Sequence, residues 1–400
     1  MDRVVAAFGL SLALLLSTAV TPVPTVAEEP YQPVRQTRQV GGEPEVLEWP
    51  KPRERLFGDP GEVTVALTGD LLWHMSLLKS VRLDAKKMGS KRAEEYGPLM
   101  AAVKPILNDV DMAVCHAEVP VVPKGVEVTG YPIFGAPMST MRVIEDMGFD
   151  ACTMASNHSL DRGFAMLKHT IDTFEKAGVV TVGTARSAKD AERVSIFTTE
   201  SGVRIGLVAG SYGSNVGWDT KRPWAVSKLH APTMIARAKA AREAGADIVI
   251  ANAHAGIEYQ HAPDSQQREL AQKLTASGVI DLVYMHHAHV VQPWEKLNGV
   301  WVVYGTSNLV GQMMTSTPHA NEGIIARFAF DRDDSGGWKV TKADYVPLFV
   351  SHATPTRPAR IYHVKKALAE GKGDTERLRV ALKRTRKVVH QMGAKGITES

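Results

Sequence analysis

Several features that would identify common classes of protein are absent from this chain. No segment after the first 27 residues is apolar enough to span a bilayer. The net charge is only +4 at pH 7, which gives no large basic field of the kind that binds nucleic acid. The glycine-rich run at residues 210–217 lacks the pattern of a phosphate-binding loop, so it does not indicate a nucleotide site. No repeat of solenoid period is present.

The first residues have the form of an export signal. Arg3 precedes the apolar stretch 4–20, and small residues at 25–27 offer a cleavage site. Residues 1–27 are therefore predicted to be a signal peptide, with an uncleaved N-terminal anchor as the alternative because the stretch is long. Either interpretation places the remainder outside the cytoplasmic membrane, secreted or anchored to its outer face. No cysteine follows closely, so lipoprotein attachment is not indicated.

Cysteine is scarce, with only Cys115 and Cys152 in the chain. An exported protein meets conditions in which a disulfide can form. Both residues lie inside predicted strands, however, and the geometry of a bridge between neighbouring strands is exacting. We therefore expect two buried free thiols rather than a disulfide.

The composition divides the rest of the chain into three parts. Residues 28–60 are rich in Pro, Gln, Arg and Glu without periodicity, and are predicted to form an extended linker. Residues 61–354 are predicted to be the folded domain. Residues 355–400 are predicted to be a basic helical tail. A solvated tail is the favoured interpretation, and contact with anionic lipid or an anionic polymer is a hypothesis that rests on the charge alone.

Within the folded domain, apolar runs alternate with amphipathic segments. The predicted strands that precede polar residues are 63–68, 112–115, 149–155, 246–251 and 279–285. The predicted helices are 91–107 with an interruption near Gly97-Pro98, 139–147, 163–177, 232–244 and 265–276, with 361–369 and 375–392 in the tail. Three hairpins turn at 201–202, 298–299 and 331–337. Parallel units followed by antiparallel strands predict an α/β sandwich of two sheets covered by helices.

The most informative local feature is His286-His287-Ala288-His289, which directly follows the predicted strand 279–285. Sites of α/β proteins lie beyond the carboxyl ends of the strands. The spacing of His287 and His289 can direct two imidazoles toward one metal ion, and His286 is expected to be structural. Alone, the pair is weak evidence, because a polar strand end with spare histidines is the more common explanation.

Four more predicted strands end in side chains that can bind a metal. They lead into Gly69-Asp70, His116-Ala117-Glu118, Ser156-Asn157-His158 and Asn252-Ala253-His254. Taken singly, each has an ordinary alternative as a turn residue, a solvated carboxylate or a hydrogen-bonded core histidine. Because strand ends of one sheet converge on one crevice, the five together predict a metal site.

The donor types restrict the metal. Oxygen and imidazole ligands without thiolate suit Mn, Fe or Zn better than copper or a structural zinc finger. We expect one or two divalent ions, held by Asp70, Glu118, Asn157, His254, His287 and His289. Asp70 and Glu118 are the candidates for a carboxylate that bridges two ions roughly 3.5–4 Å apart. Two ions would lower the pKa of a shared water toward neutrality.

His158 is predicted to be a general acid, or a donor to a developing oxyanion, rather than a ligand. Asp161 either fixes the tautomer of His158 or caps the helix predicted over 163–177, and the residues favour neither interpretation. Glu258, a candidate catalytic residue, is expected to line the pocket with Tyr259, although an ordinary loop would explain both.

Two further histidines receive no chemical task. His74 is expected to line the pocket, and His116 to lie outside the ligand shell.

Six short motifs occur in order between about residues 63 and 349. They are Gly69-Asp70, Ala117-Glu118, Ser156-Asn157-His158 with Leu160-Asp161-Arg162-Gly163, His254-Ala255-Gly256-Ile257-Glu258-Tyr259, His286-His287-Ala288-His289-Val290-Val291-Gln292, and Tyr304-Gly305-Thr306-Ser307-Asn308-Leu309-Val310. Together these motifs resemble the CapA-type capsule synthesis proteins, which are linked to poly-γ-glutamate production.

The resemblance implies a calcineurin-like metallophosphatase fold, a four-layer α/β/β/α sandwich of mixed sheets with its site at the strand ends. It also implies that the six residues named above as ligands match metal ligands of related phosphoesterases, and that His158 matches their acid. The chain departs from the Asp-x-His pattern of those enzymes at Leu72, which leaves open whether both metal positions are filled. CapA-type chains share that loss. Compared with the CapA-type motifs, this chain has His116-Ala117 for Asn-Leu, Ala288 for Pro, and Thr306-Ser307-Asn308-Leu309 for Leu-Gly-Asn-Phe.

Residues and resemblance together favour an extracytoplasmic protein of poly-γ-glutamate or capsule polymer synthesis or release. The first hypothesis is metal-dependent hydrolase or transferase chemistry on an anionic surface polymer. One alternative is a non-catalytic, membrane-tethered component that binds the polymer during export, and another is a secreted metallophosphodiesterase. The expected partners are the polymer and other membrane components of its synthesis, and no nucleic acid is expected.

Overall fold

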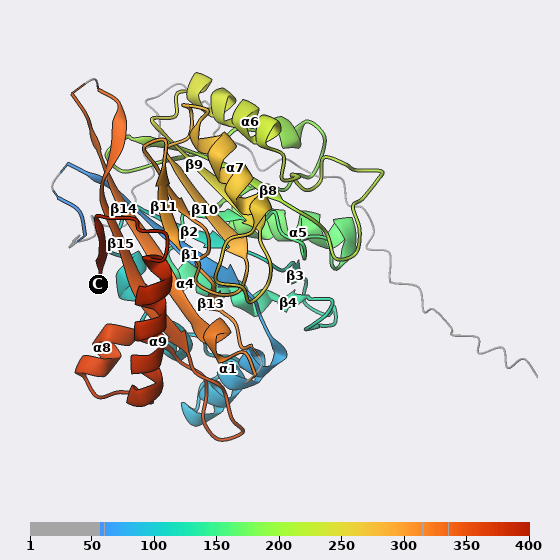
Figure 1. The fold of residues 1–400 in the computed structure, drawn as a ribbon. Helices are drawn as coiled ribbons and strands as arrows, with labels where there is room; N and C mark the ends of the chain where they lie inside the picture. Colours follow the sequence, from blue (N-terminus) through green and yellow to red (C-terminus); the bar gives the residue numbers. More distant parts are fainter. Residues whose placement is uncertain (1–56, 60, 314–315, 335) are drawn as a thin grey trace, which may run out of the picture. The chain divides into compact units, whose positions relative to one another are not determined.

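Two β-sheets pack face to face in the computed structural model, and helices cover their outer sides (Figure 1). The structure describes residues 57–59, 61–313, 316–334 and 336–400. The predicted signal or anchor at 1–27 lies outside the described residues, as does all of the predicted linker 28–60 except 57–59. Among the described residues, no helix combines the length and the apolarity needed to cross a membrane.

The first sheet is mixed and has nine strands within the described part of the chain. They are β1 (Val63–Leu71), β2 (Met112–His116), β5 (Ala151–Thr153), β6 (Val180–Val182), β13 (Asn308–Val310), β14 (Glu322–Arg332), β15 (Trp338–Val350), β16 (Ile361–His363) and β17 (Ile397–Glu399). The main order is β16-β15-β14-β1-β2-β5-β6, with β13 beside β1 and β17 beside β15. The half from β1 to β6 is parallel, and β14, β15 and β16 continue it in antiparallel fashion.

The second sheet, of order β11-β12-β10-β9-β8-β7, is parallel at its centre. Its strands are β7 (Ser195–Thr198), β8 (Arg204–Ser211), β9 (Ile248–Ala255), β10 (Leu282–His287), β11 (Trp294–Leu297) and β12 (Val300–Val303). The hairpins β7–β8, β11–β12 and β14–β15 turn where the sequence predicts. A separate short pair joins β3 (Val121–Val122) and β4 (Ala136–Pro137).

The helices are α1 (Met75–Lys87), α2 (Gly97–Met100), α3 (Lys104–Leu107), α4 (Met141–Met147), α5 (Gly163–Lys176), α6 (Ala231–Glu243), α7 (Ser265–Thr275), α8 (Val364–Ala369) and α9 (Thr375–Val389). Short 3-10 turns are η1 (Met138–Thr140), η2 (Asp190–Glu192) and η3 (Pro318–Asn321). The helix predicted over 91–107, with an interruption near Gly97-Pro98, is wrong in its first part: residues 91–96 are not helical, and only the short helices α2 and α3 form, each with a proline in its first turn. The predicted cap Asp264 closes a capping box with Gln267 at the start of α7.

The alternation of side chains along β9 explains the layers. Ile248 and Ile250 belong to the core between the sheets, whereas Val249 and Ala251 pack with the residues of α6 and α7. Burial on both faces explains why such strands appear in the sequence as continuous apolar runs. The predicted four-layer α/β/β/α sandwich of mixed sheets is therefore confirmed.

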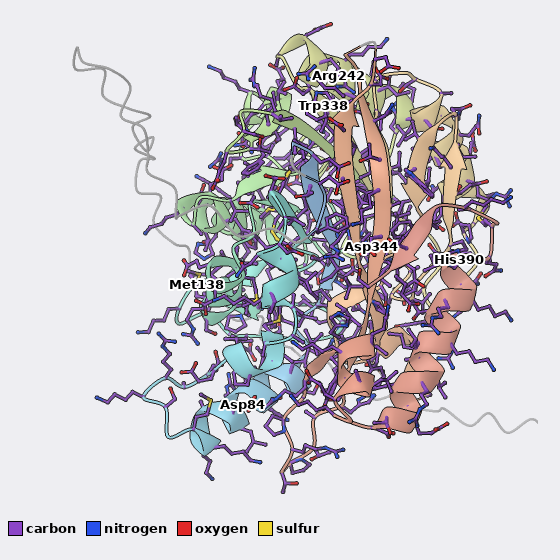
Figure 2. All side chains as sticks on the ribbon, turned by 90° about the vertical axis from the view of Figure 1, so that its left-hand side faces the viewer. Asp84, Met138, Arg242, Trp338, Asp344 and His390 are labelled. Atoms are coloured by element: carbon purple, nitrogen blue, oxygen red, sulfur yellow. A yellow bond between two sulfur atoms is a disulfide. The ribbon has the colours of Figure 1, made fainter. Side chains whose placement is uncertain are left out.

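The C-terminal segment is part of this domain, so the prediction of a solvated tail over 355–400 is wrong. β16 and β17 both pair with β15. Helices α8 and α9 bury Leu378 against Phe349, and Figure 2 shows α9 alongside the long strands, with Asp344 and His390 labelled. Basic side chains of the segment have partners: Arg377 and Arg384 donate to the buried carboxylate of Glu322, at 3.0 and 2.6 Å. The apolar face of α9 outweighs the charge that suggested a free tail.

Cys115 and Cys152 form a disulfide, so the expectation of free thiols is wrong. They lie opposite each other on the neighbouring strands β2 and β5, with Cα atoms 4.5 Å apart. Both are buried, as predicted. The sequence predicts the two strands, but the register that brings the sulfurs together is a property of the assembled sheet.

Candidate metal centre

The six predicted ligands meet between the two sheets, at the carboxyl ends of parallel strands. Asp70, Glu118 and Asn157 come from the ends of β1, β2 and β5, and His254, His287 and His289 come from β9 and β10. Each of the six residues is at most 4% exposed. The predicted convergence of these strand ends is therefore present in the structure.

The pairing of β9 and β10 aims two histidines into the space between the sheets. His254 and His286 are opposite each other in the register of these strands. Because side chains alternate along a strand, His254 lies on the face of Ile250, and His286 on the face of Tyr284, within the shared core. The strands extend further than predicted, so that His254, His286 and His287 lie inside them.

Backbone strain is concentrated around the site. Positive φ angles occur at Tyr259 (64°), His287 (93°), His289 (53°) and Ser307 (63°), a region that non-glycine residues rarely adopt. Two hydrogen bonds hold these turns: Tyr259 N–H donates to the Ala288 carbonyl at 2.7 Å, and the Ser307 hydroxyl donates to the His289 carbonyl at 2.9 Å. Strain of this kind persists where the surrounding structure enforces it, commonly at functional sites.

One half of the site consists of Asp70, Glu118 and His289. Nδ1 of His289 lies 3.2 Å from Oδ2 of Asp70, and Nε2 of His289 lies 3.6 Å from Oε1 of Glu118. One ligand atom from each residue fits within 4.8 Å of the others. Asn308 Oδ1 lies 2.9 Å from His289 Nδ1, which fixes the imidazole and leaves Nε2 to face Glu118.

The other half consists of Asn157, His254 and His287. Nε2 of His254 lies 2.7 Å from Oδ1 of Asn157 and 4.0 Å from Oε1 of Glu118. The His254 and His287 rings are 4.9 Å apart between centroids. Glu118 is therefore within reach of both halves, as a bridging carboxylate must be.

The hydrogen bonding of the site shows that these residues fit a divalent cation. Both oxygens of Asp70, both oxygens of Glu118, Nδ1 of His287 and Nε2 of His286 are buried without a hydrogen-bond partner among the described residues. Polar groups without a partner are rare in protein interiors, and buried carboxylates are costly unless paired or bound to metal. A divalent cation bound by Asp70 and Glu118 would offset the charge of these two buried carboxylates.

The protonation of the ligands follows from burial and from neighbouring charge. Burial raises the pKa of Glu118 to about 7. Burial lowers the pKa of His287 to about 3 and lowers that of His254 well below its ordinary value, which keeps both rings in the neutral form that binds metal. Burial acts in the same direction on His289, but the charges of Glu118 and Asp70 outweigh it and raise that pKa to about 10.

His158 stands beside the ligands with a carboxylate behind it. Its Nδ1 lies 2.7 Å from Oδ2 of Asp161, which also accepts the N–H of Phe134 at 2.8 Å. No side chain caps α5, so of the two interpretations of Asp161 only the contact with His158 is present. Burial lowers the pKa of His158, but the hydrogen bond that the ring donates to Asp161 and the charges of Glu118 and Asp161 outweigh it, and the net shift is upward.

The remaining histidines near the site have structural neighbours. His74 lies against the ring of Phe134, 5.6 Å away between centroids, and accepts the N–H of Gln312. His116 bridges Thr153 and His254, with its two ring nitrogens 2.8 Å from Thr153 Oγ1 and 3.0 Å from His254 Nδ1. His116 therefore orients a ligand from outside the ligand shell.

Glu258 and Tyr259 lie at the open side of the site. Glu258 is exposed, and its carboxylate comes within 4.8 Å of ligand atoms of His287 and His289. The Tyr259 ring lies 6.2 Å from that of His289, and burial together with Glu258 raises its pKa to about 12.

Three loops around this opening carry exposed apolar side chains. Tyr212 covers His287 at 4.5 Å between ring centroids and is 40% exposed. Among the described residues, seven large hydrophobic side chains are exposed, and five of them belong to these loops: Tyr131, Ile133, Tyr212, Val216 and Ile257. A concentration of exposed apolar groups beside a polar site is typical of a binding surface. We call these five residues the rim.

Several residues of the site were missed by sequence reasoning. The backbone N–H of Asn215 donates to the backbone carbonyl of Asn157, and the side-chain Nδ2 of Asn215 lies 3.3 Å from His158 Nε2. Phe134 packs edge-on against His158 at 4.9 Å. Asn215 lies in the glycine-rich run 210–217, whose pattern predicts no nucleotide site and gives no other indication of a role. No sequence motif indicates that Phe134 belongs to the site. Asn308 lies in the last of the six motifs, but was assigned no contact there.

Solved structures with a related architecture include two phosphoesterase-type proteins. The calcineurin-like phosphoesterase YfkN from Bacillus subtilis has a TM-score of 0.43 and 16% identity, covering 80% of this chain and 99% of that one. A putative 5'-nucleotidase from Staphylococcus aureus has a TM-score of 0.43 and 13% identity, covering 72% of this chain and 54% of that one. Because both TM-scores are below 0.5, we infer nothing about chemistry from them.

Curated relatives are capsule and polyglutamate proteins by name. The PGA biosynthesis protein CapA of Bacillus subtilis is 30% identical over 222 residues, 54% of this chain and 55% of that protein. The capsule biosynthesis protein CapA of Bacillus anthracis is 27% identical over 230 residues, 55% of this chain and 52% of that protein. A probable polyglutamine synthesis accessory protein of Mycobacterium tuberculosis is 29% identical over 170 residues, 40% of this chain and 44% of that protein. The chain thus spans about half the length, or less, of the curated relatives it matches.

The family profile described as Bacterial capsule synthesis protein PGA_cap matches residues 64–313, more than half of the chain. That range contains all six ligands of the candidate metal centre as well as His158 and Asp161. The resemblance drawn from the six motifs is confirmed: this chain belongs to the bacterial capsule synthesis protein PGA_cap family.

Proposed function

We propose that this chain is a metal-dependent hydrolase or transferase that acts on poly-γ-glutamate or a related anionic surface polymer. The observation that carries the proposal is the meeting of two buried carboxylates with an amide and three imidazoles, beside the His158–Asp161 pair. The substrate class is supported by the names of the relatives, which refer to PGA biosynthesis and to polyglutamine synthesis.

The ligands would divide into two groups. Asp70 and His289 would hold an ion on one side, and Asn157, His254 and His287 would hold one on the other, with Glu118 shared. Divalent ions in such a site polarise a carbonyl or phosphoryl oxygen and lower the pKa of water.

His158 would supply the proton. Asp161 accepts a hydrogen bond from Nδ1, which fixes the tautomer and favours the protonated ring. Phe134 packs edge-on against the ring and Asn215 Nδ2 lies 3.3 Å from Nε2, so both neighbours restrict the ring. Protonation of a leaving amine by Nε2 would complete cleavage of a γ-glutamyl amide.

The rim is suited to the less polar part of such a substrate. A γ-linked glutamate repeat carries two methylene groups between its amides, and Tyr131, Tyr212 and Ile257 offer apolar surface close to the ligands. The polymer's carboxylates would be attracted by the bound cations.

We also propose that the chain works outside the cytoplasmic membrane. The support is the apolar stretch at 4–20, and the Cys115–Cys152 disulfide fits an oxidising compartment. Fusion of a reporter enzyme that is active only after export would test this, and a cytoplasmic reporter signal would contradict it.

The test of the activity is direct. The purified full chain with Mn²⁺ is incubated with poly-γ-glutamate, and newly formed amino groups and chain length are measured. Loss of the acid in His158→Ala should lower the rate by roughly 100-fold or more, whereas His261→Ala, which changes a histidine outside the site, should not. Turnover of a chromogenic phosphodiester in place of the polymer would instead support the metallophosphodiesterase alternative.

A second candidate function is favoured by one observation. Leu72 is a buried apolar residue at the position where related phosphoesterases have a histidine ligand. A non-catalytic polymer-binding component would tolerate that loss. Metal-loaded protein that binds poly-γ-glutamate but does not cleave or transfer it would support this candidate and contradict the first.

A further inference from the structure

His286 occupies a place in the site that its expected structural role does not explain. It is 1% exposed, on the face of β10 that points toward the first sheet. Its Nδ1 lies 2.5 Å from Oδ1 of Asp70, although those two residues come from strands of different sheets. Nε2 of His286 has no hydrogen-bond partner among the described residues, and neither oxygen of Asp70 has one. An imidazole and a carboxylate from different sheets thus meet in the core at close range.

The neighbouring His116 provides an informative contrast. The two rings are stacked, 4.1 Å apart between centroids and 9° from parallel. Both nitrogens of His116 are engaged, one with Thr153 and the other with His254, so this residue is committed to orienting a ligand. His286 is held less tightly: besides its contact with Asp70, its Nδ1 makes one long hydrogen bond, at 3.4 Å to Thr306 Oγ1. The stacking therefore helps to orient His286, whose Nδ1 faces Asp70 and whose Nε2 has no hydrogen-bond partner among the described residues.

The half of the site around Asp70 is the one that lacks a ligand. Of the six predicted ligands, only Asp70, Glu118 and His289 contribute ligand atoms to this half. Leu72, two residues after Asp70, is apolar and its N–H is used by the Val310 carbonyl. Asp70 and His286 also form a group of their own with His116, with ligand atoms within 4.8 Å of one another.

We propose that His286 is a direct ligand of the ion at Asp70 and replaces, from the second sheet, the imidazole that is absent at position 72. The ion would then have Asp70, Glu118, His289 and His286 as protein ligands. Two carboxylates and two imidazoles form a donor set that suits Mn, Fe or Zn. The assignment rests on the proposed metal-dependent function and specifies how its first ion is held.

The ordinary alternative is that His286 only orients Asp70, as a hydrogen-bond donor. The two roles differ in the size of the expected effect. Removing an orienting partner of a ligand typically weakens metal binding roughly 10–100-fold and leaves the ion in place at high concentration. Removing a direct ligand should abolish the ion at Asp70 and leave the ion at His254 and His287.

The experiment measures metal content and affinity rather than activity. The full chain and its variants are stripped with a chelator, titrated with Mn²⁺ or Zn²⁺ by calorimetry, and analysed for bound metal after gel filtration. We expect two ions in the unchanged protein, one in His286→Ala and in His286→Gln, and two in the control His261→Ala. Thermal unfolding in chelator shows whether each variant is folded.

A rescue variant tests the replacement itself. Leu72→His combined with His286→Ala returns an imidazole to the first strand, and should restore the second ion. Long-range ¹H–¹⁵N spectra of the Zn²⁺-loaded, histidine-labelled protein provide an independent readout. They should show the Nδ1 of His286 without a proton, because a metallated nitrogen cannot keep one.

The outcomes separate this proposal from the function on which it rests. Retention of two ions in His286→Ala with an affinity within about 100-fold of the unchanged protein, or a protonated Nδ1 in the loaded protein, would overturn the role of His286 alone. If the unchanged protein binds a single ion and His286→Ala still binds it, the role of His286 would likewise be overturned. An unchanged protein that binds no divalent ion would overturn the proposed function as well.

Discussion

Replacement of Glu118 by glutamine should have opposite effects on stability with and without metal. Glu118 is fully buried, its oxygens have no hydrogen-bond partner among the described residues, and burial raises its pKa from 4.5 to about 7. A raised carboxyl pKa means that the folded protein favours the protonated form. Stability is therefore highest below pH 4.5 with respect to this group, and is lost as the pH rises from 4.5 to about 7.

The magnitude follows from that shift. Because one pKa unit corresponds to about 1.4 kcal/mol, the ionised Glu118 costs the metal-free protein about 3 kcal/mol of folding free energy at pH 8. Glutamine has nearly the same shape and remains neutral. In chelator at pH 8, Glu118→Gln should therefore be more stable than the unchanged protein by about 3 kcal/mol, and this difference should nearly vanish at pH 4.5.

Metal should reverse the order at pH 8. An ion present at 1,000 times its dissociation constant stabilises the protein that binds it by about 4.1 kcal/mol, which exceeds the advantage of Glu118→Gln in chelator, and the variant lacks the shared ligand. Urea denaturation in chelator and in Mn²⁺, at both pH values, measures these differences, with the exposed Glu200→Gln as the matched control. A variant that is less stable in chelator at pH 8, or that gains as much from Mn²⁺ as the unchanged protein, would refute the reasoning.

Three further predictions concern the acid, the C-terminal segment and the rim. Asp161→Asn should lower the pKa of His158, because the imidazolium loses the carboxylate that accepts its hydrogen bond. Histidine NMR titration measures this, and an unchanged pKa would contradict the pairing. Glu322→Ala should destabilise the domain by roughly 1–3 kcal/mol, since it leaves Arg377 and Arg384 without their partner; denaturation that matches the unchanged protein would show that the C-terminal segment is held without this contact. Tyr212→Ala should raise the KM for poly-γ-glutamate more than it lowers kcat, and an effect on kcat alone would argue against a rim that binds substrate.

The sequence predicts the convergence of the ligands because the relevant signal is local. Each ligand follows or ends an apolar run that is predicted to be a strand. Because the carboxyl ends of parallel strands lie at the same edge of a sheet, the ligands are expected to lie close together. Asp70, Glu118 and His254 could be placed in this way without knowing which strands are neighbours. The hairpins could also be predicted from local sequence, because Gly and Asn mark their turns.

Features that depend on the packing of one element against another could not be predicted in this way. The face on which His286 lies depends on where β10 ends, and the approach of His286 to Asp70 depends on how the two sheets pack. The disulfide depends on the register of β2 and β5. The C-terminal helix α9 has a high net charge, yet the narrow apolar stripe that includes Leu378 decides its position on the sheet. α1 was missed because no cap precedes it: the residue at its start, His74, makes no side-chain capping bond.

The most direct test of the account is the metal content of the purified full chain compared with Asp70→Asn and His289→Ala. The account predicts divalent metal in the unchanged protein and a loss of at least one ion in each variant, because Asp70 and His289 face the same position beside Glu118. A native protein that contains no metal and takes up none from Mn²⁺, Fe²⁺ or Zn²⁺ would contradict it.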